Sequence, residues 1–238
     1  MGQRWALYID IEGFGAKWND DTMSAFRGIN ALMQGIYWIG DRHYRDPPNR
    51  LFAYQFGDGF LIASEFHEAS LDRAILVGVA LLRHLLANGE TAKCSVAEGG
   101  LSDVQGCYPK EIRSQLTRQN IQLGRGVMTV TPVMGSALVR AASMQKKAPP
   151  GPLMVVSIKN RDRVGTDLSL TKATGEVAAV NWLLGDFPGL IELQTATGFA
   201  HHTEAERESQ LRNYIGANKC LSGDWKTNAR KYLLHNGI

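Results

Sequence analysis

The sequence predicts an α+β fold built on one mixed β-sheet. Short apolar runs rich in strand-forming residues are bounded by glycines, and segments with helical apolar spacing alternate with them. Two of the apolar runs are separated only by a Gly-Asp pair, which is typical of a β-hairpin. The resulting order is strand, helix, hairpin, helix, strand, helix, strand, a pattern that favours helices packed on one mixed sheet.

Composition limits the classes of function. The chain has 238 residues, of which 44% are hydrophobic and 21% charged, so disorder, collagen and coiled coil are excluded. A net charge of +3 with interspersed signs is too weak to indicate a nucleic-acid partner or a membrane surface. Three cysteines form no disulfide framework or zinc pattern, and the longest apolar run, 74–87, contains Arg83 and His84. We expect a cytoplasmic protein without membrane insertion.

The first half of the chain contains the clearest patterns. Residues 5–11 (WALYIDI) predict a strand that ends before Gly13, and apolar residues at helical spacing predict a helix over 21–39. Residues 51–64 predict the hairpin. A helix is expected from about Ser70 to the Asn-Gly pair that follows residue 87.

The second half is less regular. Residues 92–97 predict a strand closed by a glycine pair, and within the polar segment 102–130 only a short helix is expected, in KEIRSQL. Residues 136–147 predict a helix that ends at a proline-rich stop, and 153–158 predict a buried strand.

No linker divides the chain into two domains. Thr203 and Glu206 form a capping-box pattern, and the apolar spacing over 225–233 predicts a last helix. We therefore expect a core over 1–160 and a C-terminal part, 161–238, that completes the same structural unit and ends in helices.

Two carboxylates are candidates for chemistry. Asp10 lies near the end of the first strand and Asp58 at the tip of the hairpin. If that strand pairs with the hairpin, both oxygen ligands meet at one edge, where they suit Mg²⁺ or Mn²⁺ with substrate phosphates. The turn 12–15 offers backbone N–H groups to a polyphosphate at a helix start. Alternatively, Asp58 and the glycines serve only as turn residues.

Three segments resemble class III nucleotidyl cyclases. Asp10-Ile-Glu-Gly-Phe14 is similar to their Asp-Ile-x-Gly-Phe motif, and Gly57-Asp58 resembles their second metal motif. Residues 134–157 resemble the helix and strand that follow, so the likeness covers about 5–160. It implies a palm-like, ferredoxin-like βααββαβ sheet with flanking helices and a C-terminal helical extension.

The resemblance also implies a mechanism. Two Mn²⁺ or Mg²⁺ ions would be held by Asp10, Asp58 and the Ile11 carbonyl, and Gly13 and Phe14 would lie at the substrate. The ribose 3′-hydroxyl of a nucleoside triphosphate would attack the α-phosphate, and pyrophosphate would leave. Family members form their sites across a head-to-tail homodimer, so a homodimer is implied.

Two departures from the family pattern bear on the substrate. Adenylyl cyclases usually carry a lysine at the position of Tyr54 and an acidic residue near 131–134, where this chain reads Thr-Pro-Val-Met. A tyrosine suits a smaller base, and its hydroxyl can donate to a pyrimidine carbonyl. Alternatively, Tyr54 is a cross-strand packing residue.

Two further departures bear on catalysis. Val139 and Ser143 occupy the positions of the family's catalytic asparagine and arginine, and Arg140 lies one residue past the first. Arg140 is therefore the candidate for transition-state charge from a shifted register. The alternative is an arginine on an exposed helix face.

Altered base readers and the C-terminal extension resemble the bacterial Pycsar pyrimidine cyclases of antiphage systems. The resemblance implies conversion of UTP to 3′,5′-cyclic UMP and activation of a separate effector by the product. CTP conversion to cyclic CMP is the alternative within that class, and an adenylyl cyclase with relocated base readers is a further one. An inert cyclase-like domain that senses nucleotides or mediates assembly is the alternative of another class.

Overall fold

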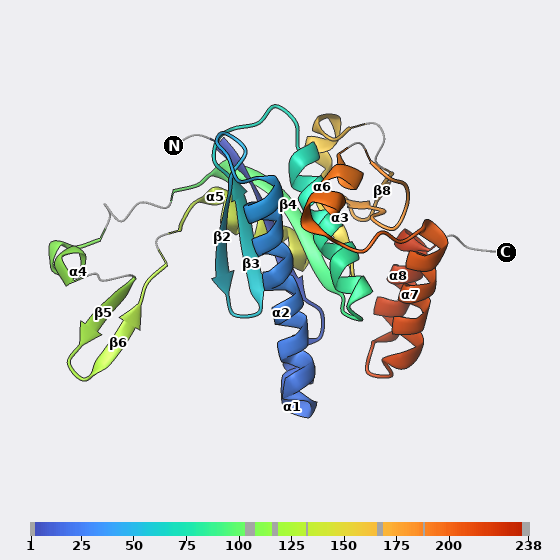
Figure 1. Ribbon diagram of the computed structural model, residues 1–238, viewed down its shortest axis with the longest axis horizontal. Coiled ribbons are helices and arrows are strands. Elements are labelled where there is room, and N and C mark those ends of the chain that lie inside the picture. The colour runs from blue at the N-terminus through green and yellow to red at the C-terminus, as the bar shows by residue number, and fades with distance from the viewer. Residues whose placement is uncertain are drawn as a thin grey trace.

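The protein is built on a seven-stranded mixed sheet with helices on both faces (Figure 1). The computed structural model describes residues 3–102, 108–115, 119–131, 133–165, 169–187 and 189–234. Strand order is β2-β3-β1-β4-β7-β9-β8. The β4–β7 pair is parallel and the other pairs are antiparallel, which confirms the predicted α+β class with one mixed sheet.

The element bounds follow the chain from residue 3. The strands are β1 (Gln3–Ile11), β2 (Leu51–Phe56), β3 (Gly59–Ser64), β4 (Ala92–Gly100), β5 (Asn120–Leu123), β6 (Gly126–Thr129), β7 (Met154–Ser157), β8 (Leu170–Lys172) and β9 (Val177–Val180). The helices are α1 (Phe14–Asp20), α2 (Thr22–Trp38), the π-helix η1 (Ile39–His43), α3 (Asp72–Ala87), α4 (Lys110–Gln115), α5 (Ser136–Lys147), the 3₁₀-helix η3 (Ile158–Arg163), α6 (Leu190–Thr197), α7 (Glu204–Ala217) and α8 (Gly223–Leu233). Within the described ranges, no helix is long and apolar enough to cross a membrane.

The N-terminal half has the predicted βααββαβ order, from β1 through α1, α2, β2, β3 and α3 to β4. The helix expected over 21–39 is α2, and a short additional helix, α1, precedes it. The two helices are separate because the Asp21 side chain caps α2 and accepts a hydrogen bond from the Ser24 N–H at 3.1 Å.

The two faces of the sheet differ. Alternate β1 residues, among them Leu7 and Ile9, lie in the main core, and α3 contacts β1 and β4. Ala6 and Tyr8 point to the opposite face and pack in a second cluster with Ala137 of α5. Since side chains alternate along a strand, Asp10 lies on the α5 face, two residues beyond Tyr8.

The glycine pair that predicted the end of β4 forms its last two residues, so the strand continues past the expected residue 97 and ends at Gly100. A Cβ added at Gly99 would lie 2.4 Å from Ser136 Oγ and 2.7 Å from the Ala137 nitrogen. Gly99 therefore also permits the close approach of α5.

The segment 102–130 contains more structure than expected. The short helix is present as α4, and the hairpin β5–β6, turned at Gly124 with φ 58°, was not predicted. In Figure 1 this hairpin extends away from the sheet. Its four-residue strands are mostly exposed, so they lack the apolar alternation that would have identified them.

The C-terminal part adds β8, β9 and α6, which were not predicted, and α7 and α8, which were. The predicted capping box at Thr203 and Glu206 begins α7. A single hydrophobic cluster includes Leu7 of β1 and Leu211 and Leu233 of the last two helices.

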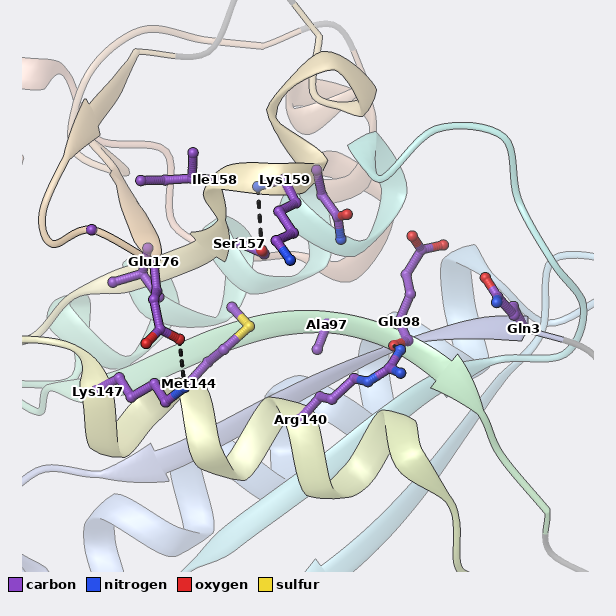
Figure 2. A pocket seen from close by; sticks show the side chains of 13 residues that line it. Gln3, Ala97, Glu98, Arg140, Met144, Lys147, Ser157, Ile158, Lys159 and Glu176 are labelled. Carbon is purple, nitrogen blue, oxygen red and sulfur yellow. Dashed lines mark hydrogen bonds and ion pairs between the residues drawn. The ribbon is translucent and has the colours of Figure 1, made fainter.

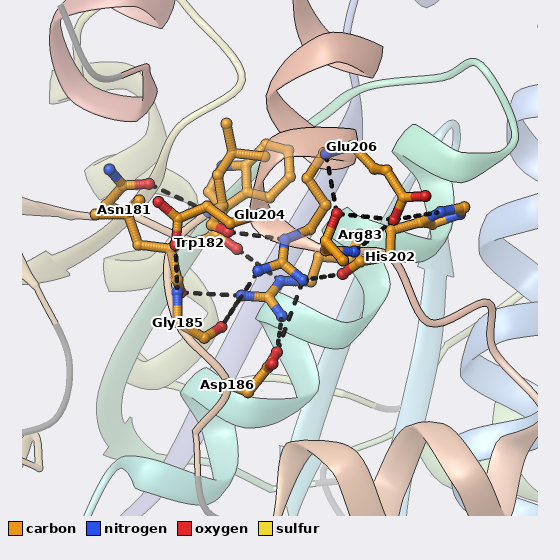
Figure 3. A network of polar contacts seen from close by, with 12 residues as sticks. Arg83, Asn181, Trp182, Gly185, Asp186, His202, Glu204 and Glu206 are labelled. Carbon is orange, nitrogen blue, oxygen red and sulfur yellow. Dashed lines mark hydrogen bonds and ion pairs between the residues drawn. The ribbon is translucent and has the colours of Figure 1, made fainter.

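Two buried arginines join α7 to α3 (Figure 3). Arg83 Nε donates to the Trp182 carbonyl at 2.7 Å, and Arg207 Nε donates to the Leu183 carbonyl at 2.8 Å. Asp186 lies 3.3 Å from Arg83 and 3.7 Å from Arg207. Burial, and then the charge of Arg207, lower the pKa of Arg83 to about 10. Main-chain carbonyls of the segment after β9 satisfy most of these donors, so the pair links three elements that are distant in sequence.

Candidate two-carboxylate site

Strand pairing brings Asp10 and Asp58 together. In the β1–β3 ladder Asp10 is opposite Gly59, the residue that follows Asp58. Gly57 adopts φ 64°, a left-handed conformation that a tight hairpin turn needs and that glycine tolerates. The hairpin therefore presents Asp58 beside the end of β1, as the sequence predicted.

Gly59 has no side chain, and this leaves room for Tyr8 and Asp10 above the hairpin. A Cβ at Gly59 would lie 2.5 Å from the Tyr8 hydroxyl oxygen and 3.0 Å from Asp10 Oδ1. Tyr8 and Asp10 thus lie over the backbone of the hairpin, where a side chain would displace them. Tyr8 was not predicted as a site residue, and its position two residues before Asp10 on one strand face was the available signal.

The two carboxylates influence each other electrostatically. The pKa of Asp10 is raised to about 6, first by burial and then by the Asp58 charge, while Lys93 opposes both. Burial also raises the pKa of Tyr8, with added contributions from Asp10 and Asp58. Half-buried like charges of this kind favour a bound cation, because a cation offsets both their repulsion and their lost hydration.

The donor set fits a hard divalent cation that also binds substrate phosphates. Two carboxylates supply oxygen ligands, which Mg²⁺ and Mn²⁺ prefer, and Mg²⁺ usually binds through one or two carboxylates plus phosphates. Over the described ranges, no group of three or more His, Cys, Asp or Glu side chains is suited to hold a metal ion. The Ile11 side chain is buried in the main core, and a role for its carbonyl stays a prediction.

One backbone N–H group of the turn after β1 already forms a hydrogen bond within the protein. The Glu12 N–H donates to the Thr91 carbonyl at 2.9 Å, so this amide is not available to a polyphosphate. Gly13 adopts φ 71° and turns the chain into α1, which begins at Phe14. Contacts of Gly13 and Phe14 with a substrate stay predictions.

Two further charged residues surround the site and were not predicted. Lys93 pairs with Asp10 across β1 and β4, and its Nζ donates to the Ala148 carbonyl at 3.2 Å. Burial raises the pKa of Glu12, and a hydrogen bond from Trp225 lowers it. Trp225 Nε1 lies 3.1 Å from Glu12 Oε2, which links α8 to the turn beside the carboxylates.

Tyr54 lies on the same face as the carboxylates. Leu61 is opposite both Tyr54 and Tyr8, so the three residues form one row across β2, β3 and β1. Gly59 and Asp10 belong to the next row along that face. Half-buried Tyr54 packs against the second hydrophobic cluster, which is consistent with both a packing role and a place beside a substrate.

Arg140 lies far from the carboxylates within one chain. Its Nη1 donates to the Glu98 carbonyl at 2.8 Å (Figure 2). Glu98 pairs with Trp5, five residues before Asp10 on β1, so the separation along the strand is roughly 17 Å. Val139 of the same helix is 66% exposed. The chain alone does not bring Arg140 to the two carboxylates.

The second expected base-reading neighbourhood is only partly described. Met134 forms an isolated bridge with Ser102 next to the start of α5. Pro132 lies outside the described residues.

Comparisons with known proteins found similarity among solved structures only. No protein-family model matches the sequence, and no curated protein matches it. Among solved structures, a class III adenylyl cyclase-like ATP-binding protein from Pseudomonas aeruginosa is similar, with a TM-score of 0.45 and 11% sequence identity. The likeness covers 69% of this chain and 35% of that one, so this chain spans about a third of that protein's length.

Proposed function

We propose that this chain is a metal-dependent nucleotidyl cyclase that converts a pyrimidine nucleoside triphosphate, UTP in the first place, to its 3′,5′-cyclic monophosphate and pyrophosphate. The observation that carries the proposal is the placement of Asp10 and Asp58 side by side through the β1–β3 register. This pair lies in a βααββαβ sheet and within sequence motifs that resemble those of class III cyclases.

The two carboxylates supply the ligands for the reaction. Bound Mn²⁺ or Mg²⁺ would acidify the ribose 3′-hydroxyl and neutralise the triphosphate. Asp10 and Asp58 would hold these ions, and the raised pKa of Asp10 would fall as a cation replaces repulsion by attraction. Lys93, next to Asp10 in the ladder, contributes positive charge on the side away from Asp58.

Tyr54 supports the choice of a pyrimidine. Its row on the sheet is adjacent to that of Asp10, so a nucleotide whose phosphates bind at Asp10 would have its base near this ring. A phenol hydroxyl both donates and accepts, which suits the 4-position of uracil and of cytosine. CTP is therefore the alternative substrate.

The distance between Arg140 and the carboxylates favours a site that two chains complete. A homodimer with two-fold symmetry would place α5 of one protomer beside the Asp10 and Asp58 of its partner. In the biological setting we propose, the cyclic product made in the cytoplasm activates a separate effector during antiphage defence.

A second candidate function is a cyclase-like domain that binds nucleotides without turnover. Arg140 donates to a main-chain carbonyl at the other end of β4, and Val139 and Ser143 lack the groups of a catalytic asparagine and arginine. Tight nucleotide binding in the presence of metal, without product, would favour it over the cyclase.

The test is product analysis with each nucleotide. Purified protein is incubated with Mn²⁺ and ATP, GTP, CTP or UTP separately, and products are resolved by mass spectrometry. We expect cyclic UMP, and far less of it from Asp58→Asn. Cyclic CMP would change the base, whereas cyclic AMP would remove Tyr54 from the base-reading role. No product from any nucleotide, with a folded dimer confirmed, would contradict the proposal.

A further inference from the structure

A cavity lies beside Ala97 and Glu98 of β4 (Figure 2). Asp10 pairs with Lys93, near the other end of this strand. The cavity has a volume of about 730 Å³ and opens between α5, β4, η3 and the turn that joins β8 to β9. Its wall includes the polar residues Glu98, Arg140, Ser157, Lys159 and Glu176. The volume falls in the range of pockets that hold small organic ligands.

The charges around this cavity do not cancel. Lys147 pairs with Glu176, and Arg163, behind the wall, pairs with Glu98. Arg140 binds a main-chain carbonyl, and among the described residues no carboxylate pairs with it or with Lys159. The cavity therefore carries two positive charges without a counter-charge from the described protein.

Glu98 adds a separate indication of a missing partner. Its side chain is 8% exposed, and one carboxylate oxygen binds Arg163. The other oxygen, Oε1, is buried and has no hydrogen-bond donor. A buried acceptor of this kind costs free energy unless a donor reaches it.

We propose that this cavity binds an organic phosphomonoester that carries hydroxyl or amino donors, of the size of a nucleoside monophosphate. A phosphomonoester has a charge of roughly −1.5 to −2 at neutral pH, which matches the charges of Arg140 and Lys159. Hydroxyl or amino groups of the ligand would donate hydrogen bonds to the Glu98 carboxylate. Met144 and Ile158 in the same wall give a ring an apolar contact surface.

Within one chain, this site differs from the two-carboxylate site in position and chemistry. Arg140 donates to the Glu98 carbonyl, and Glu98 pairs with Trp5 of β1. Asp10 is five residues farther along β1 than Trp5. The cavity offers cations rather than carboxylate pairs, so its ligand binds without a divalent metal. It would exist whether or not the carboxylates catalyse cyclisation.

Isothermal titration calorimetry on the full chain in EDTA tests the proposal. The probes are uridine 5′-monophosphate, adenosine 5′-monophosphate, uridine and inorganic phosphate. We expect at least one nucleoside monophosphate to bind about tenfold more tightly than inorganic phosphate or uridine, because it uses both the cations and the rest of the cavity. Absence of binding by both monophosphates at millimolar concentration would overturn the proposal.

Matched variants locate the binding. Lys159→Gln should weaken monophosphate binding about tenfold, whereas Arg161→Gln, an exposed residue of the same 3₁₀-helix, should change it less than twofold. Asp58→Asn should bind as the wild type does. Equal affinities for Lys159→Gln and the wild type, or loss of binding in Asp58→Asn, would overturn the proposal without reference to cyclase activity.

Discussion

Two pairs of like charges in this molecule are treated in opposite ways by the fold. Arg83 and Arg207 are almost fully buried, and main-chain carbonyls together with Asp186 accept from their guanidinium groups. Asp10 and Asp58 are half-buried at an open edge, and only Lys93 is identified as lowering the pKa of Asp10. The chain itself supplies the counter-groups of the first pair and leaves much of the second pair's charge uncompensated.

The difference separates a structural pair from a pair that we propose to be functional. A buried arginine whose N–H donors are all used stabilises the fold. Its removal leaves the carbonyl groups that it contacts buried without a donor. A carboxylate pair with excess charge destabilises the metal-free protein and gains from a bound cation. Removing a charge should therefore have opposite effects on stability in the two regions.

The largest expected effect is on turnover at the carboxylate pair. Asp58→Asn should lower cyclase turnover roughly 10³-fold, since it removes a metal ligand worth several kcal/mol of transition-state stabilisation. Its thermal midpoint without metal should not fall, because the repulsion on Asp10 is relieved. Enzyme kinetics and calorimetry measure the two effects, with the exposed Asp20→Asn as the control. Full activity in Asp58→Asn would exclude Asp58 as a ligand.

Breaking the arginine pair should act on stability instead. Arg207→Met keeps the length of the side chain but leaves buried carbonyls without donors, so we expect the free energy of unfolding to fall by about 3 kcal/mol. Urea denaturation measures it. Arg212→Met, on the exposed side of the same helix, should change stability by less than about 0.5 kcal/mol. Equal effects of the two variants would contradict the structural role.

The link between α8 and the carboxylate edge should have a smaller effect. Trp225→Phe keeps an aromatic side chain, although a smaller one, and removes the N–H donor to half-buried Glu12. We expect the lost hydrogen bond to account for about 1.5 kcal/mol of coupling. Urea denaturation of Trp225→Phe, Glu12→Gln and the double variant gives the coupling. Additive effects would show that the contact contributes nothing.

The smallest expected effect is the dependence of the free energy of unfolding on pH through Asp10 in the metal-free protein. The pKa of Asp10 is about 6 in the folded protein against an ordinary 3.8. Between these values the folded state holds a proton that the unfolded chain has released, so the free energy of unfolding falls as pH rises through this window and is constant above it.

Asp10→Asn lacks this dependence. In EDTA, its stability relative to the wild type should therefore increase by about 1 kcal/mol from pH 4 to pH 7, after allowance for partial exposure. Urea titrations at several pH values measure it. A constant difference across the range would contradict the raised pKa.

Most of the N-terminal architecture could be predicted from the sequence. The hairpin at 51–64, the helix 136–147 and the pairing that joins Asp10 to Asp58 all follow from local patterns, because apolar periodicity and glycine turns act over a few residues. The glycine pair marked the end of β4, but the contact of Gly99 with α5 could not be predicted, because α5 is distant in sequence. The strands β8 and β9 are short and carry too few residues for a periodic signal.

The sequence predicted the two acidic residues of the candidate site but not the residues that surround them. Tyr8, Lys93 and Trp225 reach Asp10 or its turn from β1, β4 and α8, and no local motif marks them. The direction of Arg140 could not be predicted either, because a helix pattern does not state which neighbour a long side chain contacts.

Local patterns were enough to predict the class of fold, the order of its N-terminal elements and the two carboxylates that meet at the end of β1 and the tip of the hairpin. These depend on side-chain periodicity and turn chemistry, which are local properties. Which charges are compensated depends on the three-dimensional packing. Arg83 and Arg207 are buried among carbonyls, Asp10 and Asp58 are half-buried, and Arg140 lines a cavity. Charge compensation depends on partners that are distant in sequence, and folding alone brings them together.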